Sequence, residues 1–133
     1  MAEIFKVQII TPDRIFYEGE AEFLEFTTTA GEIGVYAKHI PMTTVLAPGA
    51  VVIYKGDQKT IAAVHSGFAE ILGDKVTLLA EISEWPDEID VARAEAAKAR
   101  AEERIANKSL DIDMKRAELA LRRAIARIDV ASK

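Results

Sequence analysis

A single boundary near Pro86 divides this sequence into two segments whose repeat patterns require different secondary structures. Before the boundary, apolar and polar residues alternate in short runs separated by Gly, Pro and Asp, which is typical of half-buried strands joined by turns. After it, residues 87–107 and 111–130 contain no Gly and no Pro and consist mainly of helix-forming residues. The sequence therefore predicts an α+β fold: an N-terminal antiparallel β-sandwich over residues 1–86, followed by a C-terminal antiparallel two-helix hairpin over residues 87–133.

The first segment carries several strand and turn signals. Phe5, Val7 and Ile9 alternate with polar residues, and residues 51–54 are placed to pair with residues 60–64. Residues 69–72 and 75–79 flank Gly73-Asp74, and a glycine in the first position of a two-residue loop is typical of a type II′ hairpin turn. We expect Gly31 and Gly34 to bracket another tight connection.

The second segment is predicted to form two helices with narrow apolar stripes. Asp87 and Glu88 place negative charge at the start of the first helix, and Asp111 and Asp113 do so for the second, where such charge is favourable. The predicted stripes are Ala92, Ala96, Ala99 and Ile105 on the first helix, and Ala117, Ala120, Leu121, Ala124, Ile125 and Ile128 on the second. Because a hairpin with an alanine seam is marginally stable alone, we expect it to depend on the sandwich, a ligand or a partner, and to be able to leave any of them.

Composition excludes several classes of function. The net charge of −5 argues against a general nucleic-acid binder, and the lack of cysteine rules out disulfides and thiolate chemistry. The two histidines, His39 and His65, fit no metal-ligand spacing and no Ser/His/Asp arrangement, so we expect neither a metal site nor a catalytic residue. No run is long enough for a membrane span, and the N-terminus lacks the basic flank of a signal peptide. We therefore expect no direct membrane insertion and a chain that faces the cytoplasm.

Arginine is concentrated in the second segment, where seven of the eight arginines lie at or after Arg93. The planar guanidinium group suits phosphate and carboxylate. A helical segment this rich in guanidinium groups is expected to meet anions, either on a partner protein or on a nucleotide. The alternative is that these arginines form ordinary surface ion pairs with Glu95, Glu102 and Glu118.

Five blocks of the sequence resemble the epsilon subunit of bacterial F-type ATP synthases. In order they are TPDRIFYEGEAEFL, GEIGVYAKHIPMTTVLAPG, HSGFAEILGDKVTLLAE, IDVARAEAAKARAEERI and DIDMKRAELALRRAIARI. The second block is the most specific, and the third departs from the family in having His65-Ser66 where a small pair is usual. The resemblance covers essentially the whole chain. It implies a β-sandwich followed by a helical hairpin, in agreement with the two periodicities.

The resemblance implies a non-catalytic role without a catalytic cofactor. In that family the sandwich docks on the rotor, against the central-stalk gamma subunit and the membrane c-ring, at the cytoplasmic face of the cell membrane. The hairpin can extend into the catalytic head, built of alpha and beta subunits, where it restrains ATP hydrolysis. In some bacterial members the folded-down hairpin binds ATP as a regulatory ligand, which favours the non-inhibitory state.

The resemblance also implies two sets of functional residues. The nucleotide motif Ile/Leu-Asp-x-x-Arg-Ala matches residues 89–94 in full, and the implied ATP-binding set is Glu84, Ile89, Asp90, Arg93, Ala94, Arg100, Arg123 and Arg127. The set implied to meet an acidic segment of the catalytic head in the extended state is Lys115, Arg116, Arg122, Arg123 and Arg127. Trp85 is expected to cover the junction between the two segments rather than to stack on adenine.

Two other interpretations stay open from the sequence. A purely structural rotor coupler would have the same fold and a hairpin that does not bind nucleotide. A stand-alone β-sandwich that binds or converts a small molecule is disfavoured, because no catalytic arrangement can be assembled from the residue spacing.

Overall fold

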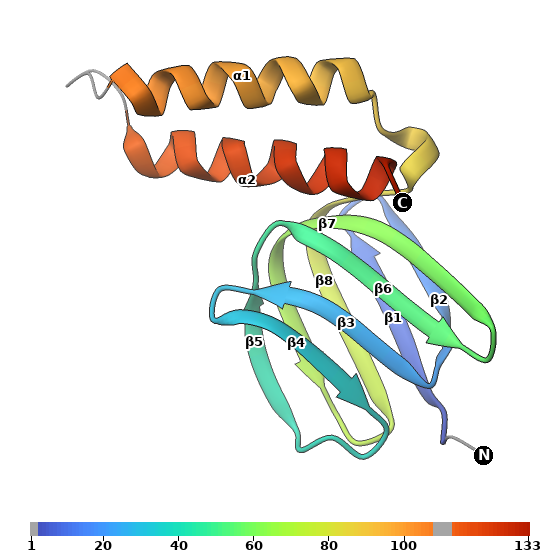
Figure 1. Cartoon of the computed structure of the whole chain (residues 1–133). Coiled ribbons are helices and arrows are strands. Elements are labelled where there is room, and N and C mark those ends of the chain that lie inside the picture. Colours follow the sequence, from blue (N-terminus) through green and yellow to red (C-terminus); the bar gives the residue numbers. More distant parts are fainter. Residues whose placement is uncertain (1–2, 108–112) are drawn as a thin grey trace.

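The computed structural model describes residues 3–107 and 113–133. Its strands are β1 (Phe5–Thr11), β2 (Arg14–Ala21), β3 (Phe23–Thr28), β4 (Gly31–Tyr36), β5 (Met42–Leu46), β6 (Gly49–Lys55), β7 (Gln58–Ile71) and β8 (Lys75–Glu84). A short 3-10 turn, η1 (Pro86–Glu88), leads to the helices α1 (Val91–Asn107) and α2 (Met114–Ala131). Figure 1 shows the two helices side by side across one end of the strands, with α2 between α1 and the sandwich. The predicted α+β architecture is confirmed.

The sandwich is closed by one long strand that belongs to both layers. β7 pairs with β6 through residues 58–64 and with β5 through residues 67–71. One layer contains β2, β1, β8, β7 and β5, and the other contains β4, β3, β6 and β7. The prediction of an antiparallel sandwich needs one correction, because β1 and β8 run parallel from Lys6↔Lys75 to Ile10↔Leu79. The pairing joins the first and last strands of the sandwich, a long-range contact that local periodicity does not report.

β7 was predicted as two separate strands, but it is one continuous strand. Unusual backbone angles in its middle change which side of the strand faces the core. Ala62 and Val64 point into the core, and so do Ala69 and Ile71, so the inward side changes from even to odd positions within the strand. Ser66 (φ 50°) and Gly67 (φ 138°) lie at that change. A Cβ atom at Gly67 would overlap the carbonyl oxygen of Leu79 and come within 2.9 Å of the Ala80 Cα. Only glycine fits there without displacing β8.

The turn chemistry differs from the prediction at Gly73. Its φ angle is not in the left-handed region, so the predicted type II′ turn is wrong. Neighbouring segments hold this turn instead: the Gly73 carbonyl accepts from the Lys38 N–H at 2.7 Å, and the Asp74 carbonyl accepts from the Lys6 N–H at 2.9 Å. A glycine in the first position of a two-residue loop does adopt a left-handed conformation in the β6–β7 turn, where Gly56 has a φ of 58°.

Gly31 and Gly34 lie inside β4 rather than on either side of a loop, which corrects the prediction for that segment. The reason for Gly34 is steric, because a Cβ atom there would lie 2.6 Å from the Phe23 ring. The Phe23 ring also packs against Tyr36 at a centroid distance of 4.4 Å. The glycine therefore makes room for a cross-strand aromatic pair.

Each helix begins at an aspartate whose side chain accepts a backbone N–H. The Asp90 carboxylate accepts from the Arg93 N–H at 3.1 Å, and the Asp113 carboxylate accepts from the Arg116 N–H at 3.1 Å. Asp87 and Glu88 were predicted for the first turn of the first helix, but they lie in η1, so α1 begins only at Val91. The predicted contribution of Asp111 lies outside the described residues.

The apolar stripe of α1 was predicted on the wrong face. Ala94 and Ala101 are buried, whereas Ala92, Ala96 and Ala99 are exposed. Alanine occupies so many positions of this helix that a 3.6-residue period fits more than one stripe. On α2, Ala117 and Ala124 are buried as predicted, and Ala126 and Val130 join them, while Ile125 is 46% exposed.

Candidate functional site

A small apolar cluster attaches both ends of the hairpin to the sandwich. Ala63 of β7, Ile89 before α1 and Val130 near the end of α2 are buried against one another. Ala50, Ile61 and Ala131 pack at its margin. Ile89 was predicted as a nucleotide-binding residue, and in this structure it is part of the hairpin's anchor. Since the cluster contains few large side chains, the apolar contribution to docking is modest.

A polar cluster, formed by Glu84, His65 and Arg127, lies beside this anchor. The Arg127 Nε–H donates to Glu84 Oε1 at 2.7 Å, and His65 Nε2 lies 3.1 Å from the same oxygen. The His65 side chain is 0% exposed, and those of Glu84 and Arg127 are 22% and 28% exposed. The second oxygen, Oε2, accepts no hydrogen bond from the described residues. This Glu84 cluster joins α2 to β7 and β8.

Sequence reasoning found two of the three members of this cluster. Glu84 and Arg127 belonged to the predicted ATP-binding set, whereas His65 was assigned no role at the site. Its position follows from the strand register, because Ala63 pairs with Glu84 and His65 then lies diagonally across on the same face. That register depends on the full β7–β8 pairing, which the sequence pattern did not specify.

The surroundings of Glu84 favour its charged form. The hydrogen bond from His65 and then the Arg127 guanidinium lower the pKa of Glu84 below the ordinary value of 4.5, while partial burial opposes this shift. Because the pKa is lower in the docked structure than in the unfolded chain, the interaction stabilises the structure above pH 4.5 and the gain is lost as the pH falls through the folded-state pKa.

Glu84→Gln is therefore expected to loosen the hairpin only where the glutamate is charged. Near neutral pH the variant should lose about 1–3 kcal/mol of docking free energy, and the difference from wild type should vanish once the pH falls below the lowered folded-state pKa of Glu84. The chain contains no cysteine, so Asp57→Cys and Glu103→Cys provide two dye positions, one on the sandwich and one on α1, for energy-transfer measurements of docking. If the difference in docking between the Glu84→Gln variant and the wild-type chain did not depend on pH, the charge of Glu84 would not be what holds the hairpin.

The remaining arginines of the predicted ATP-binding set lie on the hairpin and form no ion pair with a described residue. Within residues 3–107 and 113–133, no salt bridge joins Arg93, Arg100 or Arg123 to an acid, including the predicted alternatives Glu95, Glu102 and Glu118. Arg93 and Arg100 are exposed, whereas Arg123 is partly buried and its Nε is enclosed without a hydrogen-bond partner in the described part of the chain. A buried guanidinium nitrogen without an acceptor is costly.

The hairpin places Arg93 and Arg127 toward its sandwich end, whereas Arg100 and Arg123 lie near the middle of their helices. The first turn of α1, which carries Arg93, lies beside the last turns of α2, which carry Arg127 (Figure 1). Asp90 of the motif uses its carboxylate to cap α1, and Ala94 is buried in the seam between the helices. Four guanidinium groups, from Arg93, Arg100, Arg123 and Arg127, are thus available on one two-helix unit, and among the described residues only the last has an acidic partner.

Comparisons with known proteins agree along the whole chain. Residues 4–86 match the family model of the ATP synthase delta/epsilon chain β-sandwich domain, and residues 87–132 match the model of its long α-helix domain. An ATP synthase epsilon chain of Caldanaerobacter subterraneus subsp. tengcongensis is 46% identical over 134 residues, covering 100% of this chain and 97% of the relative. That of Halalkalibacterium halodurans is 47% identical over 128 residues, covering 96% of each.

The chain belongs to the ATP synthase epsilon chain family. Solved structures share the fold at low identity. A chain of the Euglena gracilis mitochondrial ATP synthase aligns with a TM-score of 0.82 and 21% identity, covering 97% of this chain and 81% of that one. A chain of the Tetrahymena thermophila mitochondrial ATP synthase central stalk and c-ring aligns with a TM-score of 0.58 and 12% identity, covering 96% and 93%.

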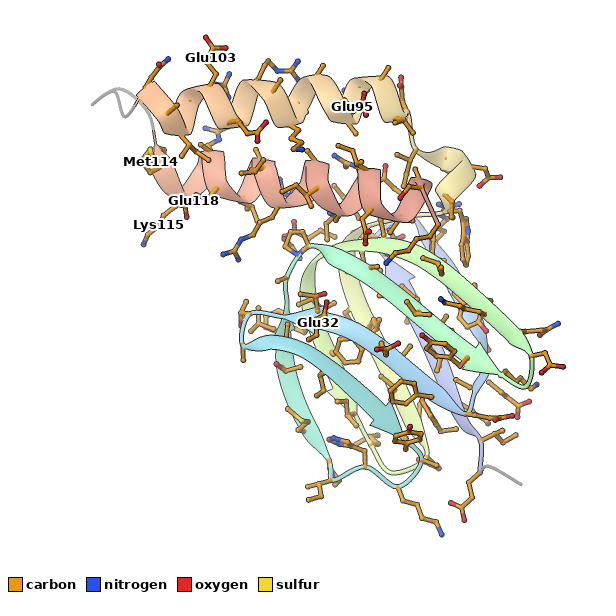
Figure 2. The ribbon with its side chains drawn as sticks, viewed as in Figure 1. Glu32, Glu95, Glu103, Met114, Lys115 and Glu118 are labelled. Carbon is orange, nitrogen blue, oxygen red and sulfur yellow. The ribbon has the colours of Figure 1, made fainter. Side chains whose placement is uncertain are left out.

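The second predicted set of this epsilon-family chain divides into two groups. Lys115, Arg116 and Arg122 are exposed on α2. Figure 2 shows Lys115 and Glu118 at the end of α2 that projects beyond the sandwich. Arg123 and Arg127 are partly buried, and Arg127 is held by Glu84. In the docked hairpin, the first three are therefore the more accessible members of this set.

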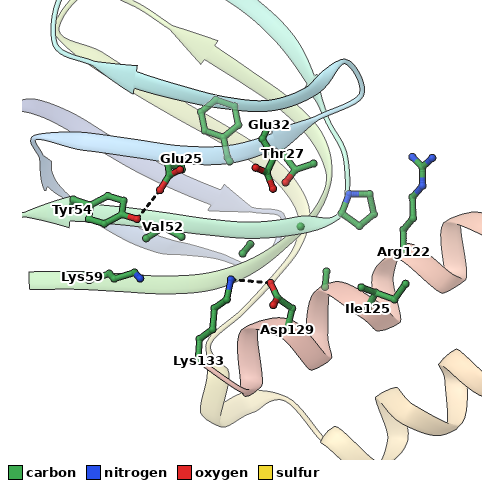
Figure 3. Close-up of a pocket in the computed structure, with 15 residues that line it drawn as sticks. Glu25, Thr27, Glu32, Val52, Tyr54, Lys59, Arg122, Ile125, Asp129 and Lys133 are labelled. Atoms are coloured by element: carbon green, nitrogen blue, oxygen red, sulfur yellow. Dashed lines mark hydrogen bonds and ion pairs between the residues drawn. The ribbon is translucent and has the colours of Figure 1, made fainter.

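A cleft lies elsewhere, between α2 and the outer side of β3 and β6 (Figure 3). It encloses about 510 Å³, and Arg122 is the only predicted site residue among the described residues on its wall. Several of its charged groups already have partners: Tyr54 donates to Glu25 at 2.6 Å, and Lys133 donates to Asp129 at 3.1 Å. The cleft does not coincide with the arginines of the predicted nucleotide site.

Trp85 packs on the core of the sandwich, and its expected role as a cover over the junction with the hairpin stays a prediction. Its ring stacks on Phe16 with centroids 4.2 Å apart and meets Tyr17 edge-on at 6.2 Å. In the described part of the chain no three His, Cys, Asp or Glu side chains are grouped to hold a metal ion. None of the described helices is long and apolar enough to cross a membrane.

Proposed function

We propose that this chain is a non-catalytic rotor subunit of an F-type ATP synthase, peripheral to the cytoplasmic face of the cell membrane, whose hairpin restrains ATP hydrolysis when extended and binds ATP when docked. Relatives that are 46% and 47% identical to this chain over nearly its full length are ATP synthase epsilon chains, which supports the subunit assignment. The Tetrahymena structure that shares the fold is described as central stalk and c-ring, which favours the rotor context.

An exposed apolar row on the sandwich supports docking to the central-stalk gamma subunit. Val45, Phe68 and Leu79 are paired neighbours on β5, β7 and β8, and the row continues through Ile10 to Ile15 on β1 and β2. Val45, Phe68, Leu79 and Ile15 are between 44% and 58% exposed. Across five strands the row is about 19 Å long. A continuous apolar surface of this kind is typical of a protein interface.

Phe68→Ser, at the centre of the row, is expected to weaken assembly with the gamma-containing catalytic head by roughly 10- to 100-fold, the scale of a central aromatic contact. The thermal midpoint should change little because Phe68 is 55% exposed. Titration of labelled chain into enzyme depleted of this subunit measures the effect. Tyr36→Ser on β4, in the other layer, is the control and should assemble normally. Equal binding by both variants would place the interface elsewhere.

The opposite end of the sandwich is the proposed contact with the c-ring. The connection between β4 and β5, residues 37–41, lies at the end far from the helices (Figure 1), and Ile40 there is 79% exposed. If the hairpin extends toward the catalytic head, the end of the sandwich away from the helices faces the membrane. The two proposed contacts therefore use separate surfaces of the sandwich.

The four guanidinium groups on one two-helix unit, of which among the described residues only that of Arg127 has an acidic partner, are the observation that best supports ATP binding by the docked hairpin. Arg123 and Arg127 lie one turn apart on α2, and Arg93 and Arg100 lie on the adjacent helix, so phosphate oxygens could satisfy several guanidinium groups at once. Glu84 Oε2 can accept from a hydroxyl or an amino group of the same ligand. ATP would act as a regulatory ligand in this arrangement and not as a catalytic cofactor.

The same arginines link ATP to inhibition. We place the contact with an acidic segment of the alpha and beta subunits on Lys115, Arg116, Arg122, Arg123 and Arg127 of the extended hairpin. Arg123 and Arg127 are partly buried when the hairpin is docked, so they become available to the head only on release. A ligand that binds only the docked form therefore lowers the extended population by its differential affinity.

Calorimetric titration of the isolated chain with ATP tests the sensor function. We expect saturable binding without release of phosphate. Absence of heat up to about 1 mM ATP, a concentration corresponding to only about 4 kcal/mol of binding free energy, would leave the structural coupler as the supported function.

A further inference from the structure

His65 is a buried polar residue that the proposed ATP site and rotor contacts do not use. Its side chain is 0% exposed, and its single hydrogen-bond partner among the described residues is Glu84 Oε1 at 3.1 Å. The other ring nitrogen, Nδ1, is enclosed without a partner in the same part of the chain. An ionised carboxylate can only accept, so Nε2 carries a hydrogen and donates it to Glu84.

We propose that His65 is a positioning residue that holds the Glu84 carboxylate where Arg127 can reach it, and thereby sets how firmly the hairpin stays on the sandwich. This role rests on the proposed function in one respect, namely that the hairpin leaves the sandwich. His65 would then shift the equilibrium between the docked and the released hairpin.

The geometry shows how an imidazole on β7 affects a helix that it does not bind. Glu84 is the last residue of β8, and its side chain has three rotatable bonds whose ordering costs conformational entropy. The contacts with His65 and Arg127 converge on one oxygen, so the imidazole fixes the atom that the Arg127 Nε–H approaches. Because the rigid, buried imidazole restricts the Glu84 side chain before the helix docks, less conformational entropy is lost on docking.

Few other contacts would compensate for a loosened Glu84. The apolar anchor of Ala63, Ile89 and Val130 is small. The nearby bidentate pair between Arg14 and Glu88, at 3.0 and 3.1 Å, is exposed and holds η1 rather than α2. Exposed pairs contribute little to stability. A change at His65 should therefore appear as a measurable shift in docking.

Two substitutions of similar volume separate the donor from the bulk of the side chain. His65→Gln keeps a side-chain N–H that can reach Glu84, whereas His65→Leu keeps an apolar group without a donor. With dyes on Asp57→Cys and Glu103→Cys, His65→Leu should raise the released-to-docked ratio by about 5- to 30-fold, and His65→Gln should restore most of it. A ratio unchanged in His65→Leu, or raised equally in both variants, overturns the proposal.

A double-mutant cycle tests whether His65 acts through the ion pair. Arg127→Ala alone should release the hairpin, and adding His65→Leu should then change the ratio by less than about 2-fold, because the group that His65 positions has lost its partner. A residue that merely fills the core would instead give additive effects. Additivity would overturn the positioning role.

The cycle also separates this proposal from the mobility of the hairpin. If Arg127→Ala and Val130→Asp both stay fully docked, the hairpin does not leave, and the proposed inhibitory function fails together with the role of His65. If those variants release the hairpin and His65→Leu does not, only the role of His65 is overturned. Should the leucine variant fail to fold, nitrogen NMR of the wild-type imidazole decides: a hydrogen on Nε2 supports the proposal, and its absence from Nε2 overturns it.

Discussion

Gly67→Ala is expected to be among the most damaging single substitutions in the sandwich. The added Cβ would overlap the Leu79 carbonyl oxygen, and the φ angle of 138° is one that residues with a side chain rarely adopt. Backbone strain and overpacking together should lower the free energy of unfolding by about 2–5 kcal/mol. For a domain of this size the thermal midpoint should fall by roughly 8–20 °C.

Gly73→Ala is the matched control for that substitution. Gly73 has no left-handed φ angle, and a Cβ atom there would meet nothing within 4 Å among the described residues. Its stability should stay within about 0.5 kcal/mol of wild type or rise slightly, because alanine restricts the unfolded chain. Thermal and urea unfolding of the two variants, followed by circular dichroism, provides the comparison. If Gly67→Ala were as stable as Gly73→Ala, β8 would have to move aside easily at Leu79.

The Gly67 position illustrates which part of the fold the sequence could predict. Alternation and the lack of Gly and Pro after residue 86 report local backbone preference, so strands and helices were assigned correctly on each side of Pro86. The change of inward side within β7 depends on the backbone angles of Ser66 and Gly67. The parallel β1–β8 pair joins distant segments. Neither feature has a local periodic signal.

At the candidate site, too, some residues could be predicted from the sequence and others depend on long-range strand pairing. The ATP-binding set came from a motif and from family resemblance. Within the described part of the chain, Glu84 and Arg127 are the one pair of that set joined by a side-chain to side-chain hydrogen bond, while the Asp90 carboxylate accepts only from the Arg93 backbone N–H. His65 was missed because its contact with Glu84 exists only in the β7–β8 register. The α1 stripe was misplaced because alanines at many positions fit several helical faces equally well. Small, repetitive side chains carry little information about which face is buried.

Arg123→Ala should separate ATP binding from hairpin docking more sharply than Arg127→Ala. The Arg123 Nε is enclosed without a partner among the described residues, so removing the side chain takes away a desolvation cost in the ligand-free hairpin and should leave docking unchanged or slightly stronger. ATP affinity should nevertheless fall by about 10- to 150-fold, the scale of a lost charge-assisted hydrogen bond. Arg127→Ala should weaken both, because Arg127 also holds Glu84.

Calorimetry for ATP and energy transfer for docking, applied to the same variants, test this separation. Arg104→Ala is the control, because Arg104 lies exposed in the last turn of α1 and outside the proposed ATP-binding set. In assembled enzyme Arg93→Ala is the more informative variant, since Arg93 is absent from the proposed contact with the catalytic head. Hydrolysis by that enzyme should require more ATP to escape inhibition, because a ligand shifts the hairpin only by its differential affinity. Superimposable activation curves for wild-type and Arg93→Ala enzymes, with inhibition intact, would eliminate the ATP sensor and leave a hairpin that restrains the enzyme without responding to nucleotide.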